Sequence, residues 1–290
     1  MLRLVLLVLA WLPGQLHAAV PAQPPVAESA QSLRYGVTLF HYYQQDYFAA
    51  LTELLAAQQL QELGAHGSNA ELLRGGMSLA YGMDRVAEQV FRELLDSNVA
   101  PSGSVDNSQA WFYLGKITWQ RGQLQRSSDA LASMSQLYEG ALRDEANFLK
   151  ASIELREGDE SAAAAYLSVL PEDSPWRYYL FYNLGAVQAA RGDWSAAVKY
   201  FSNFTHLDAD NPESMALQDK AMTAGGYALL AAGESTVAGD YFSRVRLDSP
   251  LIDRALLGHG WAAVEREDYR SALAPWQRLG ERSLMSASVR

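Results

Sequence analysis

One short pattern occurs seven times along the sequence, and this repetition limits the folds that the chain can adopt. A small residue is followed four positions later by a bulky apolar residue, and the small residues of successive copies lie 34 to 41 residues apart. The seven pairs are Ala50/Leu54, Ala87/Phe91, Ser127/Leu131, Ala163/Leu167, Ala197/Phe201, Ala238/Phe242 and Ala272/Trp276. A recurring period of this length is typical of stacked supersecondary units.

Each pair follows a short turn-like segment. The seven segments are Gln45-Asp46-Tyr47, Gly82-Met83-Asp84, Gly122-Gln123-Leu124, Gly158-Asp159-Glu160, Gly192-Asp193-Trp194, Gly233-Glu234-Ser235 and Glu267-Asp268-Tyr269. Apolar residues with helical spacing precede each turn, and no segment sustains the period-two alternation of a half-buried strand. We therefore predict helix–turn–helix units and no sheet. An irregular helical bundle is the alternative, but it does not require the turns to recur in phase.

At these residues the chain resembles the tetratricopeptide repeat (TPR) family, in which Trp-x2-Leu-Gly-x2-Tyr is followed by Ala-x3-Phe and a closing proline. Trp111, Leu114 and Gly115 match the first block. Leu184-Gly185 match it with Phe181 in place of the tryptophan. The resemblance implies an all-α fold, a right-handed α-solenoid of about seven helix–turn–helix repeats over residues 31–279.

The resemblance is weaker in the second and sixth units, where Gly75-Gly76 and Gly225-Gly226 occupy the first helix. Elsewhere the small residues have a clear physical role. Ala or Gly at a helix crossing lets the two axes approach closely, and the bulky residue fills the groove beside it.

The first 18 residues have the layout of a secretory signal peptide. Arg3 precedes an apolar run from Leu4 to Leu12, which is far shorter than the ~20 residues that span a bilayer as a helix. We expect cleavage after Ala18, or after Ala19 as the second choice, and hence a periplasmic or secreted chain. A buried N-terminal helix is the alternative, but Pro13-Gly14 would break it.

Two further segments flank the predicted repeats. Residues 19–30 contain Pro21, Pro24 and Pro25 and few bulky apolar residues, so we expect a flexible N-terminal segment. Residues 280–290 have the pattern of the start of another helix, too short to cap the last repeat. We expect either that the chain is a fragment of a longer protein or that further repeats or a second chain cover this face.

Charge and composition exclude several classes of function. The formal net charge is -10, so a nucleic-acid backbone or an anionic lipid surface would repel the chain at long range. There is no cysteine, which excludes disulfides and thiolate chemistry. No two of the five histidines lie at the three-to-five-residue spacing of a local zinc site. We expect no cofactor, no metal, no nucleic-acid partner and no transmembrane segment after signal cleavage.

Three other candidate sites each have a simpler interpretation. Gly258 to Ala263 fit a relaxed dinucleotide fingerprint but fall inside a predicted helix with no strand before it. Glu154, Glu157, Asp159 and Glu160 could hold calcium, but acids near a helix N-terminus are usually solvated. Asn203-Phe204-Thr205 is a glycosylation acceptor only in a eukaryotic host.

One enzyme class deserves comparison, because exported helical solenoids also occur in lytic transglycosylases, which use a Glu-Ser pair. Glu234-Ser235 is such a pair, but it stands in the turn of the sixth unit, and the globular catalytic domain of that class is absent. We therefore do not expect an enzyme.

The remaining prediction is a binding surface on the first helices, which line the concave face of TPR arrays. Aromatic rings give a large contact area at low entropic cost, so they are suited to bind a peptide or a sugar. The predicted face comprises Tyr35, Tyr42, Leu72, Phe112, Lys116, Trp119, Phe148, Tyr179, Tyr182, Tyr227 and Trp261. Trp119 and Tyr182 are the predicted anchors. Lys116 is the only cation in this set, so the carboxylate clamp known from the family is not expected.

These observations predict an exported TPR-like scaffold that binds a protein or peptide partner through an aromatic-lined groove. Assembly of cell-envelope or surface-polysaccharide machinery would fit the compartment. A glycan- or peptidoglycan-binding module is the first alternative, and the solenoid arm of a larger envelope enzyme is the second.

Overall fold

The computed structural model describes residues 30–63, 66–96, 105–135, 142–207 and 209–281. Within these ranges the chain forms fourteen α-helices and no strand. None of the described helices is both long enough and apolar enough to cross a membrane. The predicted signal peptide, its cleavage site, residues 19–29 and residues 282–290 lie outside the described residues.

The described helices fall into two compact units, divided between Glu157 and Gly158. The N-terminal unit contains α1 (Ala30–Tyr43), α2 (Tyr47–Gln59), α3 (Gly67–Ala80), α4 (Asp84–Asp96), α5 (Val105–Gln120), α6 (Leu124–Ala132) and α7 (Leu142–Glu157). The C-terminal unit contains α8 (Glu160–Ala165), α9 (Pro175–Arg191), α10 (Trp194–Phe201), α11 (Pro212–Ala231), α12 (Ser235–Ser243), α13 (Ile252–Val264) and α14 (Tyr269–Glu281), with short 3₁₀ helices at Tyr166–Ser168 and Ser202–His206.

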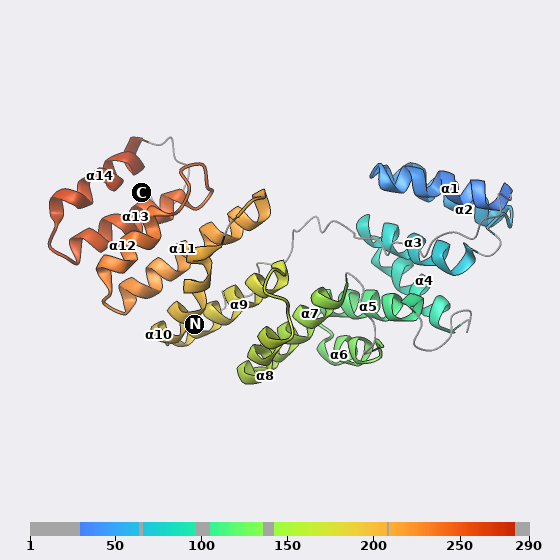
Figure 1. Cartoon of the computed structure of the whole chain (residues 1–290), viewed down its shortest axis with the longest axis horizontal. Helices are drawn as coiled ribbons and strands as arrows, with labels where there is room; N and C mark the ends of the chain where they lie inside the picture. The colour runs from blue at the N-terminus through green and yellow to red at the C-terminus, as the bar shows by residue number, and fades with distance from the viewer. Residues whose placement is uncertain (1–29, 64–65, 97–104, 136–141, 208, 282–290) are drawn as a thin grey trace. The chain divides into compact units, whose positions relative to one another are not determined.

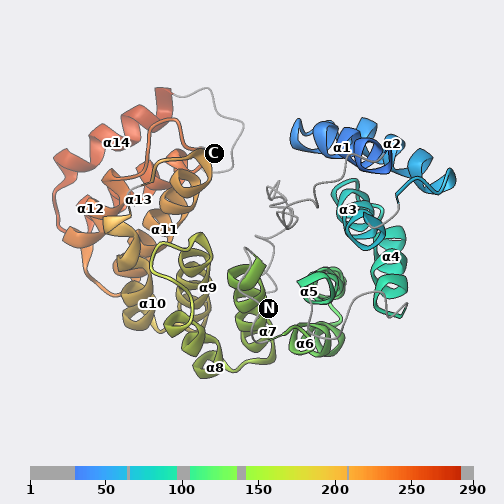
Figure 2. The ribbon, with the colours of Figure 1, turned by 45° about the vertical axis from the view of Figure 1, so that its right-hand side comes forward.

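The fourteen helices follow the predicted alternation of first and second helices in seven repeats (Figure 1). Within each unit the first helix of a repeat packs on the second helix of the repeat before it, as α11 does on α10 and α5 on α4. In the C-terminal unit the first helices α9, α11 and α13 lie on one side, and α10, α12 and α14 lie on the other (Figure 2). The prediction of an all-α repeat solenoid is therefore confirmed.

All seven predicted turns share one backbone geometry. The first residue of each turn has a φ between 60° and 92°, in the left-handed region, and five of these residues are glycines. The other two are Gln45 (φ 62°) and Glu267 (φ 60°). The next residue caps the second helix, and at Asp46, Asp159, Asp193 and Asp268 its carboxylate accepts a hydrogen bond from the backbone N–H three residues on. The turn is thus a glycine-type helix end joined directly to an N-cap.

In five of the seven repeats, a glycine on the first helix faces a large side chain on the second. A β-carbon at Gly115 would approach Leu131 to 2.7 Å, and one at Gly185 would approach Phe201 to 2.8 Å. Gly75 faces Phe91 and Gly226 faces Phe242 in the same way. Gly75 and Gly226, two of the glycines that made the second and sixth repeats look irregular, therefore place those repeats in register.

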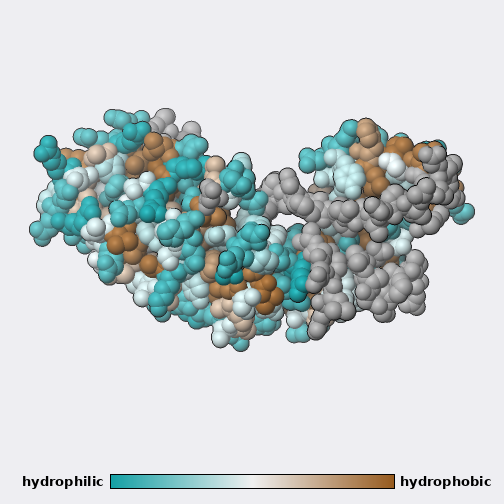
Figure 3. Space-filling view, in the orientation of Figure 1, coloured by the Kyte–Doolittle hydropathy of each residue, from teal (hydrophilic) through white to brown (hydrophobic). Residues whose placement is uncertain are grey.

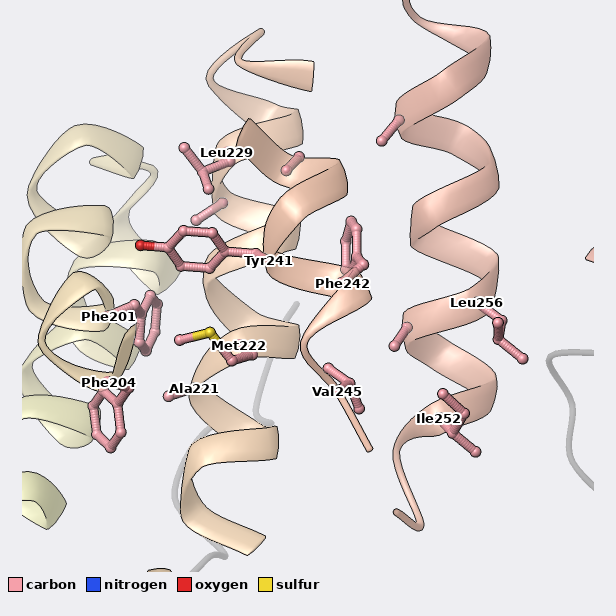
Figure 4. Packing of buried hydrophobic residues seen from close by; sticks show 14 of the residues in the cluster. Phe201, Phe204, Ala221, Met222, Leu229, Tyr241, Phe242, Val245, Ile252 and Leu256 are labelled. Atoms are coloured by element: carbon pink, nitrogen blue, oxygen red, sulfur yellow. The ribbon is translucent and has the colours of Figure 1, made fainter. Parts of the chain in front are cut away.

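A larger apolar cluster holds the repeats of the C-terminal unit together. Phe242 of α12 lies between α11 and α13, where Gly226 and Gly258 leave room for its ring (Figure 4). Beside it the buried carboxylate of Asp219 accepts hydrogen bonds from the backbone N–H and the guanidinium of Arg246, at 2.8 to 3.1 Å. A buried carboxylate requires such pairing, and here it ties α11 to the chain after α12.

Candidate functional site

The structure places all five predicted rings of the N-terminal unit in the core. Phe112 and Phe148 are fully buried, and Tyr35, Tyr42 and Trp119 are at most 7% exposed. Leu72 is also buried. These side chains stabilise the repeats from within, so they offer no ring surface to a partner in this conformation.

Trp119, one of the two predicted anchors, is covered by a neighbouring cation. The guanidinium of Arg156 on α7 lies 4.7 Å from the centroid of its ring. The sequence indicated the ring but not the arginine that packs over it, because Arg156 belongs to the next repeat. Trp119 thus belongs to the contact between the third and fourth repeats.

Lys116, the one cation in the predicted face, is already paired. Its Nζ lies 2.6 Å from a carboxylate oxygen of Glu145 on α7 and 5.8 Å from the centroid of the Phe112 ring. Both contacts are internal to the N-terminal unit. The charge of Lys116 is therefore balanced within its own unit.

The first helices of the C-terminal unit differ, because their predicted rings reach the surface. Tyr227 on α11 is 38% exposed and Trp261 on α13 is 48% exposed, while Tyr179 and Tyr182 on α9 are half-buried. α11 packs on both α9 and α13, so these rings lie on adjacent helices. We call the surface formed by Tyr182, Lys220, Tyr227, Arg254 and Trp261 the first-helix face.

Arg254 of α13 contributes a positive charge to this face. The Tyr227 hydroxyl donates a hydrogen bond of 2.8 Å to the backbone carbonyl of Arg254. Burial raises the pKa of both Tyr182 and Tyr227, and the positive charge of Arg254 acts on both hydroxyls in the opposite direction. The charge of Arg254 thus acts on tyrosine hydroxyls from two different helices, α9 and α11.

Lys220 is the second cation of the face, and like Arg254 it was missed by the sequence analysis. Each stands six residues before the core glycine of its helix, Gly226 or Gly260, at the position that Tyr179 holds relative to Gly185. Their common distance from a core glycine places both cations at the same position of their repeats. The sequence alone does not reveal this, because Gly225-Gly226 of α11 do not look like glycines that contact the second helix. Lys220 is half-buried, and burial lowers the pKa of its ammonium group.

The electrostatics of the face are those of a site that accepts an anion. Among the described residues, no acidic side chain forms an ion pair with Lys220 or Arg254. At the edge of the face the Tyr179 hydroxyl hydrogen-bonds Glu213 at 2.5 Å, and burial together with this carboxylate raises the pKa of Tyr179. Two unpaired cations amid rings can hold a carboxylate and an apolar side chain together.

The described residues give no support to the other candidate sites. No group of three or more His, Asp or Glu side chains within them is arranged to hold a metal ion. Gly258 and Gly260 lie inside the continuous helix α13, where a phosphate-binding turn cannot form. Glu234 is exposed and caps α12 with its backbone, and Ser235 begins that helix.

Comparison with known proteins gives matches only at the level of structure. No protein-family model matches the sequence. No curated protein is significantly similar to it.

Three solved structures share the fold at low sequence identity. A tetratricopeptide repeat protein from Parabacteroides merdae has a TM-score of 0.56 at 11% identity, covering 89% of this chain and 95% of its own. PilF of Pseudomonas aeruginosa has a TM-score of 0.53 at 18% identity, covering 77% of this chain and 94% of its own. The Cut9–Hcn1 structure matches at a TM-score of 0.50 and 15% identity, over 89% of this chain and 50% of that one. The chain is thus a TPR-like protein by fold.

Proposed function

We propose that the chain is an exported protein-interaction scaffold and that its first-helix face binds an extended segment of a partner protein. The fold supports the scaffold role, because the described residues form repeats that present long, adjacent helices rather than an enclosed pocket. The observation that carries the proposal is the combination of exposed rings with two cations that no described acid pairs.

The rings of the face supply apolar contact. Tyr227 and Trp261 are held by edge-to-face contacts with Phe242 and Trp276, at ring-centroid distances of 5.0 and 5.5 Å. Each ring is therefore fixed before a partner arrives, and binding costs little side-chain entropy. Fixed aromatic side chains at the centre of an interface provide most of its binding energy.

The cations of the face define the chemistry of the bound segment. Lys220 is partly desolvated, so a carboxylate from a partner would recover part of the hydration that its ammonium has lost. The bound segment therefore carries an acidic side chain or a terminal carboxylate next to an apolar or aromatic residue. The overall charge of -10 still opposes a strongly acidic partner, so rings rather than charge supply most of the affinity.

The location of this activity is part of the proposal. The apolar run from Leu4 to Leu12 and the small residues that follow it support export to the periplasm or the medium. Determining the N-terminus of the chain purified from its native host tests this directly. A chain that begins at Ala19 or Val20 supports export, and a chain that retains Met1 contradicts it.

Peptide selection tests the binding site. A displayed library of random peptides is selected on the wild-type chain, and the affinity of the enriched peptides is measured for Arg254→Glu and for Arg85→Glu. Arg85 is an exposed arginine on α4, a helix that contributes no residue to the first-helix face, and serves as the matched control. We expect peptides that contain an acid beside an apolar residue and binding that is lost only in Arg254→Glu. Equal loss in the two variants would contradict the proposal.

A glycan-binding module is the second candidate, because an exposed tryptophan such as Trp261 can stack on a sugar ring. A glycan array separates the two candidates. Binding to peptidoglycan fragments that survives Arg254→Glu but not Trp261→Ala would favour the glycan.

A further inference from the structure

The first repeat exposes two apolar residues whose counterparts in the later repeats are buried or, in one case, half-buried. Leu33 of α1 is 65% exposed and Phe40 is 59% exposed. The residues at the position of Leu33 are all buried in the later repeats: Ala70, Ala110, Ala146, Leu180, Ala221 and Ala255. Those at the position of Phe40 are buried or, in Val187, half-buried: Met77, Ile117, Ile153, Val187, Ala228 and Ala262.

The reason for this burial is the contact between consecutive repeats. In each of the six later repeats, the first helix packs on the second helix of the repeat before it. α1 therefore carries the leading half of a repeat-to-repeat contact, and apolar atoms gather over it (Figure 3). Neither Leu33 nor Phe40 has the polar character expected of a capping surface.

Gly36 leaves an unfilled space on this face of α1. It stands two residues before Thr38, which is the first-repeat counterpart of the core glycines, and so it matches Gly258 of α13. At Gly258 the ring of Phe242 from the preceding repeat fills the space of the missing side chain. At Gly36 a β-carbon would meet nothing within 4 Å. A glycine in a helix interior destabilises the helix, and no contact of the described chain accounts for this one.

The last repeat exposes the opposite side of the same repeat-to-repeat contact, on α14. Trp276 of α14 is half-buried, as Leu167 is in the fourth repeat, whereas its other five counterparts are at most 2% exposed: Leu54, Phe91, Leu131, Phe201 and Phe242. Leu273 is 53% exposed and Tyr269 is 65% exposed, and the residues at their positions in the other six repeats are all half-buried or buried. These side chains form the surface that a following first helix would cover.

We propose that two copies of the chain associate head to tail, with α1 of one copy packed on α14 of the next. In this contact Trp276 takes the place over Gly36 that Phe242 takes over Gly258, and Leu33 and Phe40 pack against Leu273 and Tyr269. The contact continues the repeat-to-repeat interface that the chain already makes within each unit, which is why a second copy fits both faces. The association is independent of the partner proposed for the first-helix face.

Substitution of Gly36 gives the sharpest test. Gly36→Leu fills open space in the single chain and removes a helix-interior glycine, so the melting temperature should rise. The same side chain blocks the place of Trp276, so self-association measured by sedimentation equilibrium should weaken by more than about tenfold. A merely structural role for Gly36 would not move these two readouts in opposite directions. Val169→Glu, at a position 52% exposed in the fourth repeat, is the control and should change neither readout.

Mixing two variants establishes the head-to-tail geometry. Leu33→Glu blocks the head and Leu273→Glu blocks the tail, and because both positions are exposed neither change should lower the melting temperature. Each variant alone should remain monomeric, and an equimolar mixture should form a complex of two chains and nothing larger. A wild-type chain that stays monomeric at all concentrations would overturn the proposal. So would a dimer that either variant still forms alone, which would indicate a symmetric contact.

Discussion

Gly75 of α3 lies against the ring of Phe91 on α4, so closely that a β-carbon at Gly75 would overlap the ring. The adjacent Gly76 faces open space, with no neighbouring atom within 4 Å of the position of its missing β-carbon. Two successive glycines of one helix thus differ in role. Gly75 allows α4 to pack closely on α3, whereas Gly76 has no contact that requires a glycine.

This difference predicts opposite effects of the same substitution. Gly75→Ala should lower the free energy of unfolding by about 1 to 3 kcal/mol, because the Phe91 ring has to move. Gly76→Ala should raise it by up to about 1 kcal/mol, because alanine favours a helix interior. Chemical denaturation of the two variants measures both effects. Equal destabilisation by the two changes would show that the register of the second repeat is wrong.

The two turns without glycine give a second prediction. Gln45 and Glu267 have φ values of 62° and 60°, which cost a residue with a side chain about 1 kcal/mol or more. Gln45→Gly and Glu267→Gly should therefore stabilise the chain by several tenths of a kcal/mol, after the greater entropy of glycine in the unfolded chain is subtracted. Gly192→Ala, at a φ of 82°, should destabilise it. Thermal unfolding of the three variants is the measurement, and a uniform sign would contradict the turn geometry.

The phase of the repeats could be predicted from the sequence because the small-to-bulky spacing and the turns recur together. The register of the first helices could not, since Gly75 and Gly226 look like helix breakers until Phe91 and Phe242 are placed over them. A glycine that accommodates a ring from another helix is distinguishable from a harmful one only in three dimensions. This is why the second and sixth repeats looked irregular.

The candidate site was only partly predictable for a related reason. Trp119 and Trp261 both lie on first helices, yet Trp119 is buried beneath Arg156, whereas Trp261 contacts Trp276 and stays 48% exposed. Burial of a ring depends on the following repeat, which residue type and spacing do not reveal. Lys220 and Arg254 were missed because their common face depends on the same glycine register.

The two tryptophans provide a third prediction. Trp119→Ala should destabilise the chain by about 3 to 5 kcal/mol, because it leaves a cavity and removes the ring beneath Arg156. Trp261→Ala should cost clearly less, because its ring is 48% exposed. Denaturation midpoints of the two variants give the comparison. A larger loss at Trp261 would place that ring, and not Trp119, in the core.

The pH dependence of stability gives a fourth prediction, which concerns His259 on α13. Burial and the nearby Arg266 lower the pKa of His259 from its ordinary value of 6.5, and Asp240 opposes them only in part. The folded chain therefore binds this proton less readily than the unfolded chain. The resulting stability is present above about pH 6.5 and is lost as the pH falls towards the lower pKa of the folded state.

His259→Gln should remove this contribution and flatten the stability profile on the acid side. Unfolding free energies of wild type and variant, compared between neutral and mildly acidic pH, measure the effect. Parallel profiles would show that His259 titrates alike in the folded and unfolded chain.

Site-specific photo-crosslinking tests the central claim, that the first-helix face binds a partner protein, most directly. A photoreactive phenylalanine analogue replaces Tyr227 on the face in one chain and Tyr81, a 49% exposed tyrosine at the end of α3, in the other. In the native host, we expect a discrete protein adduct from position 227, absent from position 81, that disappears when Arg254→Glu is added. Adducts of equal yield from both positions, or an adduct from position 227 that Arg254→Glu leaves unchanged, would contradict the account.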